Sequence, residues 1–200
     1  MRGRSLPWLL LGCMLAAPQA AGAERPKQEL TSLTLGSSAF AAQREIPSKY
    51  TCEGADVSPP LSWDGVPEDA QSLVLIVEDP DAPDPAAPRR TWVHWIVLDL
   101  PPTTRGLRED ARELPPGALD GLNDSQRTGY SGPCPPRGRH RYFFRLYALD
   151  TKLSLIKPQR AQLEAALQGH VIARAELMGT YEKKKRPQPE VLRQRGHSQP

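Results

Sequence analysis

The residues best suited to chemistry are two carboxylates set two positions apart at the end of an apolar stretch. The sequence Asp79-Pro80-Asp81-Ala82-Pro83 directly follows Leu73 to Val77. Side chains two apart in an extended chain face the same side, so both carboxylates are expected to point into one space. The two prolines stiffen that presentation. A solvated acidic turn is the competing interpretation, because Asp and Pro are also frequent turn residues.

A histidine follows in the aromatic sequence Thr91-Trp92-Val93-His94-Trp95. The β-branched and aromatic neighbours predict that His94 lies inside a strand. A single strand histidine is more often a buried structural residue than a ligand, so His94 by itself indicates little.

The third polar segment is a glycine and proline loop that runs into another expected strand, GYSGPCPPRGRHRY from Gly129. Glycine lets backbone amides approach a ligand closely, as in anion-binding nests, whereas proline offers no amide donor. The usable amides are therefore expected at Gly132 and Gly138. His140 and Tyr142 would add side-chain groups from the start of the strand.

Signatures of several enzyme classes do not occur in the sequence. It contains no G-x-S-x-G elbow, since Ser131 sits in GYSGP, and no H-E-x-x-H, P-loop, C-x-x-C or spaced metal set. The sequence thus predicts no catalytic residue, no cofactor and no metal. An enzyme that uses the Asp and His groups as acid and base is kept as an alternative.

The elements that must position these residues are mostly strands. Period-two alternation and β-branched or aromatic bulk predict strands over 30–35, 72–78, 91–100, 141–149 and 171–177. One helix is expected between Pro158, suited to a first turn, and Gly169, suited to an end. The long connections 79–88 and 115–138 are places where binding residues tend to lie. A mainly β sheet sandwich with one or two peripheral helices is the predicted fold class.

Taken together, four segments resemble the signatures of the phosphatidylethanolamine-binding protein family, in its bacterial Raf kinase inhibitor-like branch. They are CEGADVSPPLSW from Cys52, DPDAP from Asp79, WVHW from Trp92 and GPCPPRGRHRY from Gly132, and the resemblance runs from about residue 30 to 181. It implies a large central antiparallel sheet packed on a smaller sheet. It also implies a small surface pocket for phosphate or similar anions, in which a cis Ala82-Pro83 peptide is a candidate feature.

Carried over by motif, the ligand-binding residues implied by this resemblance are Asp79, Asp81, Pro83, His94, Gly132, His140 and Tyr142. Val93 stands where many eukaryotic relatives have another histidine, and the segment between Gly138 and His140 is shorter than theirs. The kinase regulation known for some eukaryotic relatives is not transferred, because this protein is expected to be exported.

The two ends of the chain differ from the predicted domain, residues 24–181. Arg2 and Arg4, an apolar run and Ala21-Gly22-Ala23 predict an export signal over 1–23, cleaved after Ala23, for a periplasmic or secreted protein. The run is too short to span a bilayer, so no integral membrane segment is expected in the mature chain. Lipidation at Cys13 is an alternative. Residues 182–200, basic and almost free of apolar side chains, predict a disordered tail.

The charge of the predicted domain bears on its partners, and its cysteine content bears on a possible disulfide. Residues 24–181 hold 18 Lys plus Arg and 21 Asp plus Glu, a net charge of −3 (18 − 21), which argues against nucleic acid as a partner. Cleavage would remove Cys13 and leave Cys52 and Cys134, either as two buried thiols or as one disulfide that stabilises the fold by roughly 4 kcal/mol.

The function predicted from the sequence is binding of a small phosphate-bearing ligand or a zwitterionic head group. Two carboxylates in one cavity repel an anion unless a proton is shared, a histidine is charged, or the ligand brings its own cation. A phosphomonoester that carries a proton, or phosphoethanolamine, is the expected ligand. The alternatives are an inhibitor or interaction protein that acts on a protease or kinase partner, and the acid/base enzyme above.

Overall fold

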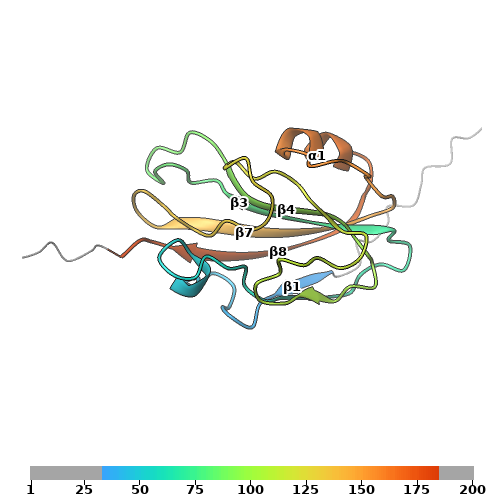
Figure 1. Ribbon diagram of the computed structural model, residues 1–200, viewed down its shortest axis with the longest axis horizontal. Helices are drawn as coiled ribbons and strands as arrows, with labels where there is room; N and C mark the ends of the chain where they lie inside the picture. Colours follow the sequence, from blue (N-terminus) through green and yellow to red (C-terminus); the bar gives the residue numbers. More distant parts are fainter. Residues whose placement is uncertain (1–32, 185–200) are drawn as a thin grey trace, which may run out of the picture.

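The computed structural model describes residues 33–184, which form two antiparallel sheets and one α-helix (Figure 1). The large sheet has the order β6-β4-β3-β7-β8, and its strands are β3 (Ser72–Asp79), β4 (Trp92–Leu100), β6 (Leu119–Asp120), β7 (His140–Leu149) and β8 (Val171–Tyr181). The small sheet has the order β1-β2-β5, with β1 (Thr34–Gly36), β2 (Leu61–Asp64) and β5 (Gly106–Leu107). A 3-10 turn, η1 (Ser48–Tyr50), and helix α1 (Arg160–Leu167) complete the elements. The predicted mainly β class is confirmed.

The large sheet is covered on both faces, which explains why β3 is buried along its whole length. Leu73, Leu75 and Val77 belong to the core that is shared with the small sheet. Val74 and Ile76 alternate with them and pack in a second core under α1. Figure 1 shows the three layers, with α1 on one side of the large sheet and β1 on the other. Alternate side chains of β3 thus pack into two different apolar cores, and neither set faces solvent.

The predicted long strands are found close to their expected positions, at 72–79, 92–100, 140–149 and 171–181. The first prediction, 30–35, is realised as β1 within the described residues. The predicted leader, including Cys13, and residues 185–200 of the predicted tail lie outside them. No helix within 33–184 is both long and apolar enough to cross a lipid bilayer.

Helix α1 is fixed at both ends and tied to the sheet. The side-chain oxygen of Gln162 accepts a hydrogen bond from the Gln159 amide at 3.0 Å, and Gly169, with φ of 80°, follows the last turn. Arg160 donates to the buried carboxylate of Glu78 at 2.7 Å, and Arg145 also pairs with Glu78. This buried carboxylate, held by two guanidinium groups, joins α1 to the sheet at the end of β3 where the acidic motif begins.

Candidate functional site

The acidic motif forms a closed loop at the end of β3. The Asp79 carboxylate accepts the Asp81 amide at 2.8 Å, and the Ala82-Pro83 peptide is cis, as the resemblance implied. The amides of Arg89 and Arg90 both donate to the Ala82 carbonyl, at 2.9 and 3.3 Å. The loop therefore returns to its own start and brings Arg90 beside the motif.

Asp79 forms a hydrogen-bonded pair with His140, the first residue of β7. His140 Nδ1 lies 2.7 Å from Asp79 Oδ2, and its Nε2 lies 2.9 Å from the Arg137 carbonyl. Nε2 must carry a hydrogen because a carbonyl only accepts, and the contact with the carboxylate needs one further proton between the two groups. Whichever group holds that proton, the pair is neutral. The negative charge of Asp79 is thereby compensated inside the protein.

Asp81 is compensated separately, by Arg141. The Arg141 guanidinium donates to both Asp81 oxygens, at 2.9 and 2.7 Å, and the Arg141 amide donates a third bond at 2.9 Å. These bonds to the Arg141 side chain lower the pKa of the Asp81 carboxyl and keep it ionised. The expectation that both carboxylates face one space is wrong: Asp79 lines the pocket, and Asp81 turns to Arg141.

A pocket of about 340 Å³ lies beside these pairs. Its walls are Asp79, Ala82, Pro83, Arg90, Trp92, His94, Ser125, Ser131, Gly132, Cys134, Pro135, Pro136 and His140. Five of the seven residues expected at the site therefore line one cavity. A larger hollow of about 580 Å³ along residues 106–116 contains none of them.

Tyr142, also expected at the site, lies beneath the pocket rather than on its wall. It is fully buried, with its ring edge-on to His94 at 5.2 Å and stacked with His140 at 6.4 Å between centroids. Its hydroxyl has no hydrogen-bond partner within residues 33–184, and burial raises its pKa. Tyr142 thus supports the two histidines from below and stays in its neutral form.

His94 presents a proton acceptor to the pocket. The ring Nδ1 donates to the Ser131 carbonyl at 2.6 Å, and the Ser131 amide donates to the His94 carbonyl at 3.1 Å. Burial lowers the pKa of His94 and favours the neutral ring. With the hydrogen on Nδ1, the second nitrogen Nε2 is an acceptor, and it has no partner in the described part of the chain.

Gly132 is needed for close packing, and its amide is already used. The amide donates to Asp56 Oδ1 at 2.7 Å. A Cβ on residue 132 would lie 2.4 Å from the Tyr50 carbonyl oxygen and 2.6 Å from Asp56 Oδ1. The expectation that this amide faces a ligand is therefore not met. Gly138, the other expected donor, is exposed and does not line the pocket.

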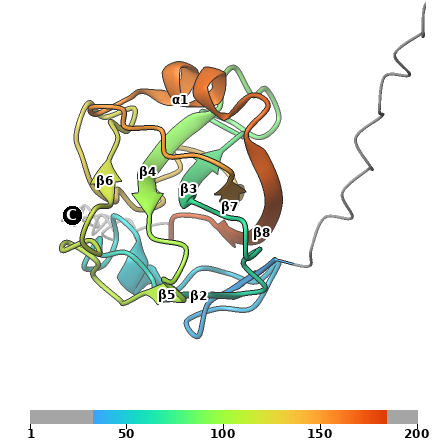
Figure 2. The ribbon, with the colours of Figure 1, turned by 90° about the vertical axis from the view of Figure 1, so that its right-hand side faces the viewer.

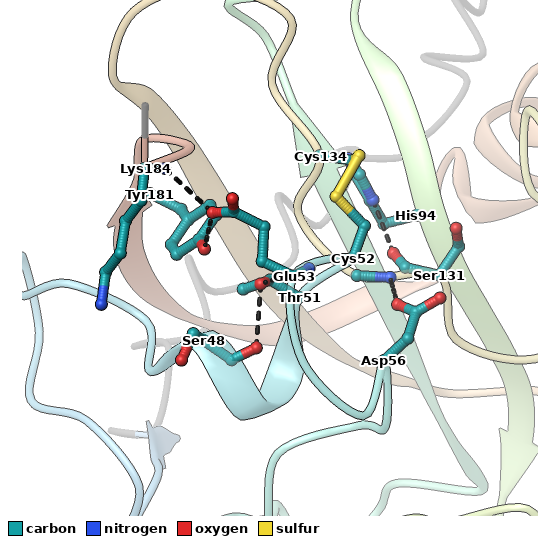
Figure 3. The surroundings of a disulfide bond; sticks show 11 residues. Ser48, Thr51, Cys52, Glu53, Asp56, His94, Ser131, Cys134, Tyr181 and Lys184 are labelled. Carbon is teal, nitrogen blue, oxygen red and sulfur yellow. Dashed lines mark hydrogen bonds between the residues drawn. A yellow bond between two sulfur atoms is a disulfide. The ribbon is translucent and has the colours of Figure 1, made fainter. Parts of the chain in front are cut away.

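The Gly132 loop is also held by a disulfide between Cys52 and Cys134, with Cα atoms 5.4 Å apart (Figure 3). The Cys52 amide donates to the Pro133 carbonyl at 3.1 Å. Figure 3 shows the bond between the turn after η1 and the loop that carries Ser131. Of the two alternatives left open by the sequence, the structure shows the disulfide.

The sequence analysis did not predict three residues that line the pocket, Arg90, Trp92 and Ser125. The Arg90 guanidinium lies over the Trp92 ring, 4.2 Å from its centroid, and forms no ion pair within residues 33–184. The spacing offered a signal, because residues 90 and 92 are two apart at the start of a strand and so share a face. Ser125 comes from a distant loop that no local pattern places here.

Among the residues that line the pocket, the balance of charge is therefore positive, although Asp56 and Asp124 lie close enough behind the wall to act on His94. Asp79 and Asp81 are each compensated by a neighbouring residue, His94 is neutral, and Arg90 contributes an unpaired cation on the wall. No cluster of three or more His, Cys, Asp or Glu side chains suited to a metal ion occurs in the described chain. The pocket wall thus presents one unpaired guanidinium group and one nitrogen that can only accept a hydrogen bond.

The chain is similar to known proteins over most of the described residues. The profile of the phosphatidylethanolamine-binding protein family matches residues 36–182. A UPF0098 protein of Methanothermobacter thermautotrophicus is 51% identical over 154 residues, which are 74% of this chain and 98% of that protein. A UPF0098 protein of Chlamydia trachomatis is 50% identical over 152 residues, 76% of this chain and 99% of its own.

Two crystal structures share the fold. A putative phosphatidylethanolamine-binding protein homolog from Chlamydia trachomatis is 49% identical, with a TM-score of 0.71 over 77% of this chain and 99% of that one. YbcL of Escherichia coli, described as a member of the mammalian family, is 34% identical, with a TM-score of 0.69 over 76% and 99% of the two chains. The match to the family profile and these similarities establish that the chain belongs to the phosphatidylethanolamine-binding protein family.

Proposed function

We propose that this chain is an exported binding protein whose pocket takes a small phosphate-bearing anion or a phosphorylated head group. The observation that carries the proposal is the charge compensation at the site. His140 neutralises Asp79 and Arg141 neutralises Asp81, so the two carboxylates no longer repel an anion. Arg90 supplies the attractive charge from a position held by the Trp92 ring.

The pocket selects an anion that still carries a hydrogen-bond donor. Nε2 of neutral His94 can only accept, so a ligand gains a bond there if it presents a P–OH group or an ammonium group. A phosphomonoester monoanion and the zwitterion phosphoethanolamine both meet this condition. Sulfate, which has the same shape and no proton near neutral pH, does not. A pocket of about 340 Å³ suits a head group rather than acyl chains.

Export and a periplasmic or secreted location are part of the same proposal. The support is the pattern of residues 1–23, with its basic start and Ala21-Gly22-Ala23. The Cys52–Cys134 disulfide is consistent with it, because such bonds persist in oxidising compartments. Expression with the native leader in a bacterial host, followed by fractionation and N-terminal sequencing, should give a mature chain that begins at Glu24. Retention of Met1 in the cytoplasmic fraction would contradict export.

Thermal unfolding with added ligand tests the pocket. Ligand at about a hundred times its Kd adds about 2.7 kcal/mol of stability. For a domain of this size, that raises Tm by about 5 to 10 °C. Inorganic phosphate and phosphoethanolamine should produce the shift, and sulfate should produce a smaller one. Nucleotides serve as a bulkier comparison.

Two neighbouring arginines provide the matched control. Arg90→Gln should lose most of the shift, whereas Arg89→Gln changes the net charge equally but leaves the wall of this pocket intact. His140→Ala should lose the shift as well, because it exposes the charge of Asp79. Equal losses in both arginine variants would indicate a general charge effect, and no shift with any of these ligands would refute an anion site.

A further inference from the structure

The outer edge of β8 is only partly covered. β8 is the last strand of the large sheet and pairs with β7 on one side (Figure 2). On its other side, the segment 43–46 covers the C-terminal part of the strand. The Gln43 amide donates to the Met178 carbonyl at 2.7 Å, the Ile46 amide to the Thr180 carbonyl at 2.8 Å, and the Thr180 amide to the Arg44 carbonyl at 2.9 Å.

The part of the edge before Met178 is open. In an antiparallel ladder, successive residues turn their backbone groups alternately to the two sides of the strand. Arg174 and Glu176 therefore turn theirs the same way as Met178 and Thr180, away from β7. No residue within 33–184 bonds to the amides or carbonyls of Arg174 and Glu176. Such a row of unpaired groups is a template for another strand.

We propose that two copies of this chain pair their β8 strands antiparallel across this edge, with the two-fold axis at Ala175. Arg174 of each copy then lies opposite Glu176 of the other, and each of these two pairs exchanges backbone hydrogen bonds in both directions. A closed symmetric dimer forms, and the two large sheets become continuous. This inference concerns assembly and does not depend on the ligand proposed above.

The charges of the strand select this register. Moving the partner by two residues one way places Arg174 opposite Arg174, and moving it the other way places Glu176 opposite Glu176. Like charges directly opposite each other destabilise strand pairing, and unlike charges stabilise it. Arg174 has no ion pair within the described residues, while Glu176 accepts from Arg145 at 2.8 Å. Charged residues commonly discourage pairing at an edge, but here their spacing is self-complementary.

The charged side chains of the open edge, Arg174 and Glu176, are exposed. A hollow of about 530 Å³, lined by Arg145, Tyr147, Arg174, Ala175 and Glu176, lies on the exposed face of β7 and β8. The segment 43–46 ends the open stretch at Met178 and so prevents a longer overlap. The register of β8 is irregular between Val171 and Ala173, and a two-fold axis at Ala175 centres the partner on the regular uncovered residues 173–177.

Charge-reversal variants test the pairing, with dimerisation measured by sedimentation velocity across a concentration series. The mature wild-type chain should dimerise reversibly. Arg174→Glu alone and Glu176→Arg alone each place like charges opposite one another, so each should weaken dimerisation about tenfold or more. A mixture of the two variants should form a heterodimer, because every opposing pair then carries unlike charges.

A cross-link tests the position of the axis. Residues that face each other without exchanging hydrogen bonds have Cα atoms about 4.5 Å apart, within the range that a disulfide bridges. Ala175→Cys should therefore oxidise to a covalent dimer. Ile156→Cys, at a side chain that is 90% exposed and outside β8, measures cross-linking by random collision.

The results of these experiments distinguish a second copy of the chain at the β8 edge from other arrangements. A monomeric wild type, or equal cross-linking at 156 and 175, would overturn the proposal. So would a dimer that both charge variants leave intact, because that dimer would use another surface. If residues 24–32 of the same chain occupied the edge instead, the protein would be monomeric and Ala175→Cys would not cross-link.

Discussion

Removal of the Cys52–Cys134 disulfide should lower the free energy of unfolding without changing the pocket. The two cysteines are 82 residues apart in sequence. In the chain-entropy treatment, opening a loop of this length releases about 15 cal/mol/K in the unfolded chain, or about 4.5 kcal/mol at 25 °C. The double variant Cys52→Ser/Cys134→Ser should therefore unfold with a free energy lower by about that amount, and its Tm should fall by about 9 to 18 °C.

The pocket should nevertheless survive this change, because other bonds hold the same loop. The Gly132 amide still donates to Asp56 at 2.7 Å, and the Tyr130 hydroxyl still donates to the Tyr50 carbonyl at 3.0 Å. The Ser131 amide still donates to the His94 carbonyl at 3.1 Å. The loss of the bond therefore acts on the unfolded chain, and the affinity of the folded variant for phosphate should stay within about threefold of wild type.

Urea unfolding at one pH measures the free energy, and its m-value reports the unfolded chain. The m-value of the double variant should rise, because a chain without the cross-link exposes more surface when it unfolds. Wild type treated with a reductant is the matched control and should reproduce the variant. A loss below about 1 kcal/mol would refute the entropic account. Lost phosphate binding at unchanged secondary structure would show that the bond itself shapes the pocket wall.

Two further predictions concern single side chains at the pocket. Because burial lowers the pKa of His94 in the fold, the unfolded chain binds more protons, and stability should fall as the pH drops below about 6.5, by at most about 1.4 kcal/mol per pH unit. His94→Asn, whose amide can still donate to Ser131, should flatten the stability curve from pH 7 to 5 in urea titrations, and an unchanged slope would contradict the buried neutral ring. Gly132→Ala should cost about 1 to 3 kcal/mol or more, since its Cβ would lie 2.4 Å from a carbonyl oxygen. Gly36→Ala, with its nearest atom at 3.9 Å, should cost about 1 kcal/mol or less in the same assay, and similar losses in both would contradict the steric argument.

The long strands were predictable because the residue types along each strand follow the environment on its two faces. In β3 and β7, side chains alternate between two apolar cores or between a core and solvent, and that alternation is visible in the residues themselves. The short strands β2, β5 and β6 were missed because two to four residues give too little periodicity. The sequence does not show whether Cys52 and Cys134 are joined, since two positions in a sequence do not reveal the distance between the two cysteines in space.

The sequence by itself determined the family, the strand faces and five residues that line the pocket, because motifs and periodicity are local properties. The tertiary structure decided which group compensates each charge. β3 lies beside β7, a strand far along the chain, and this brings Asp79 to His140 and Asp81 to Arg141. It also turned the Gly132 amide to Asp56 and left Arg90 unpaired. Alternation records the face on which a residue lies, but the partner on that face depends on which strands and loops become neighbours when the chain folds.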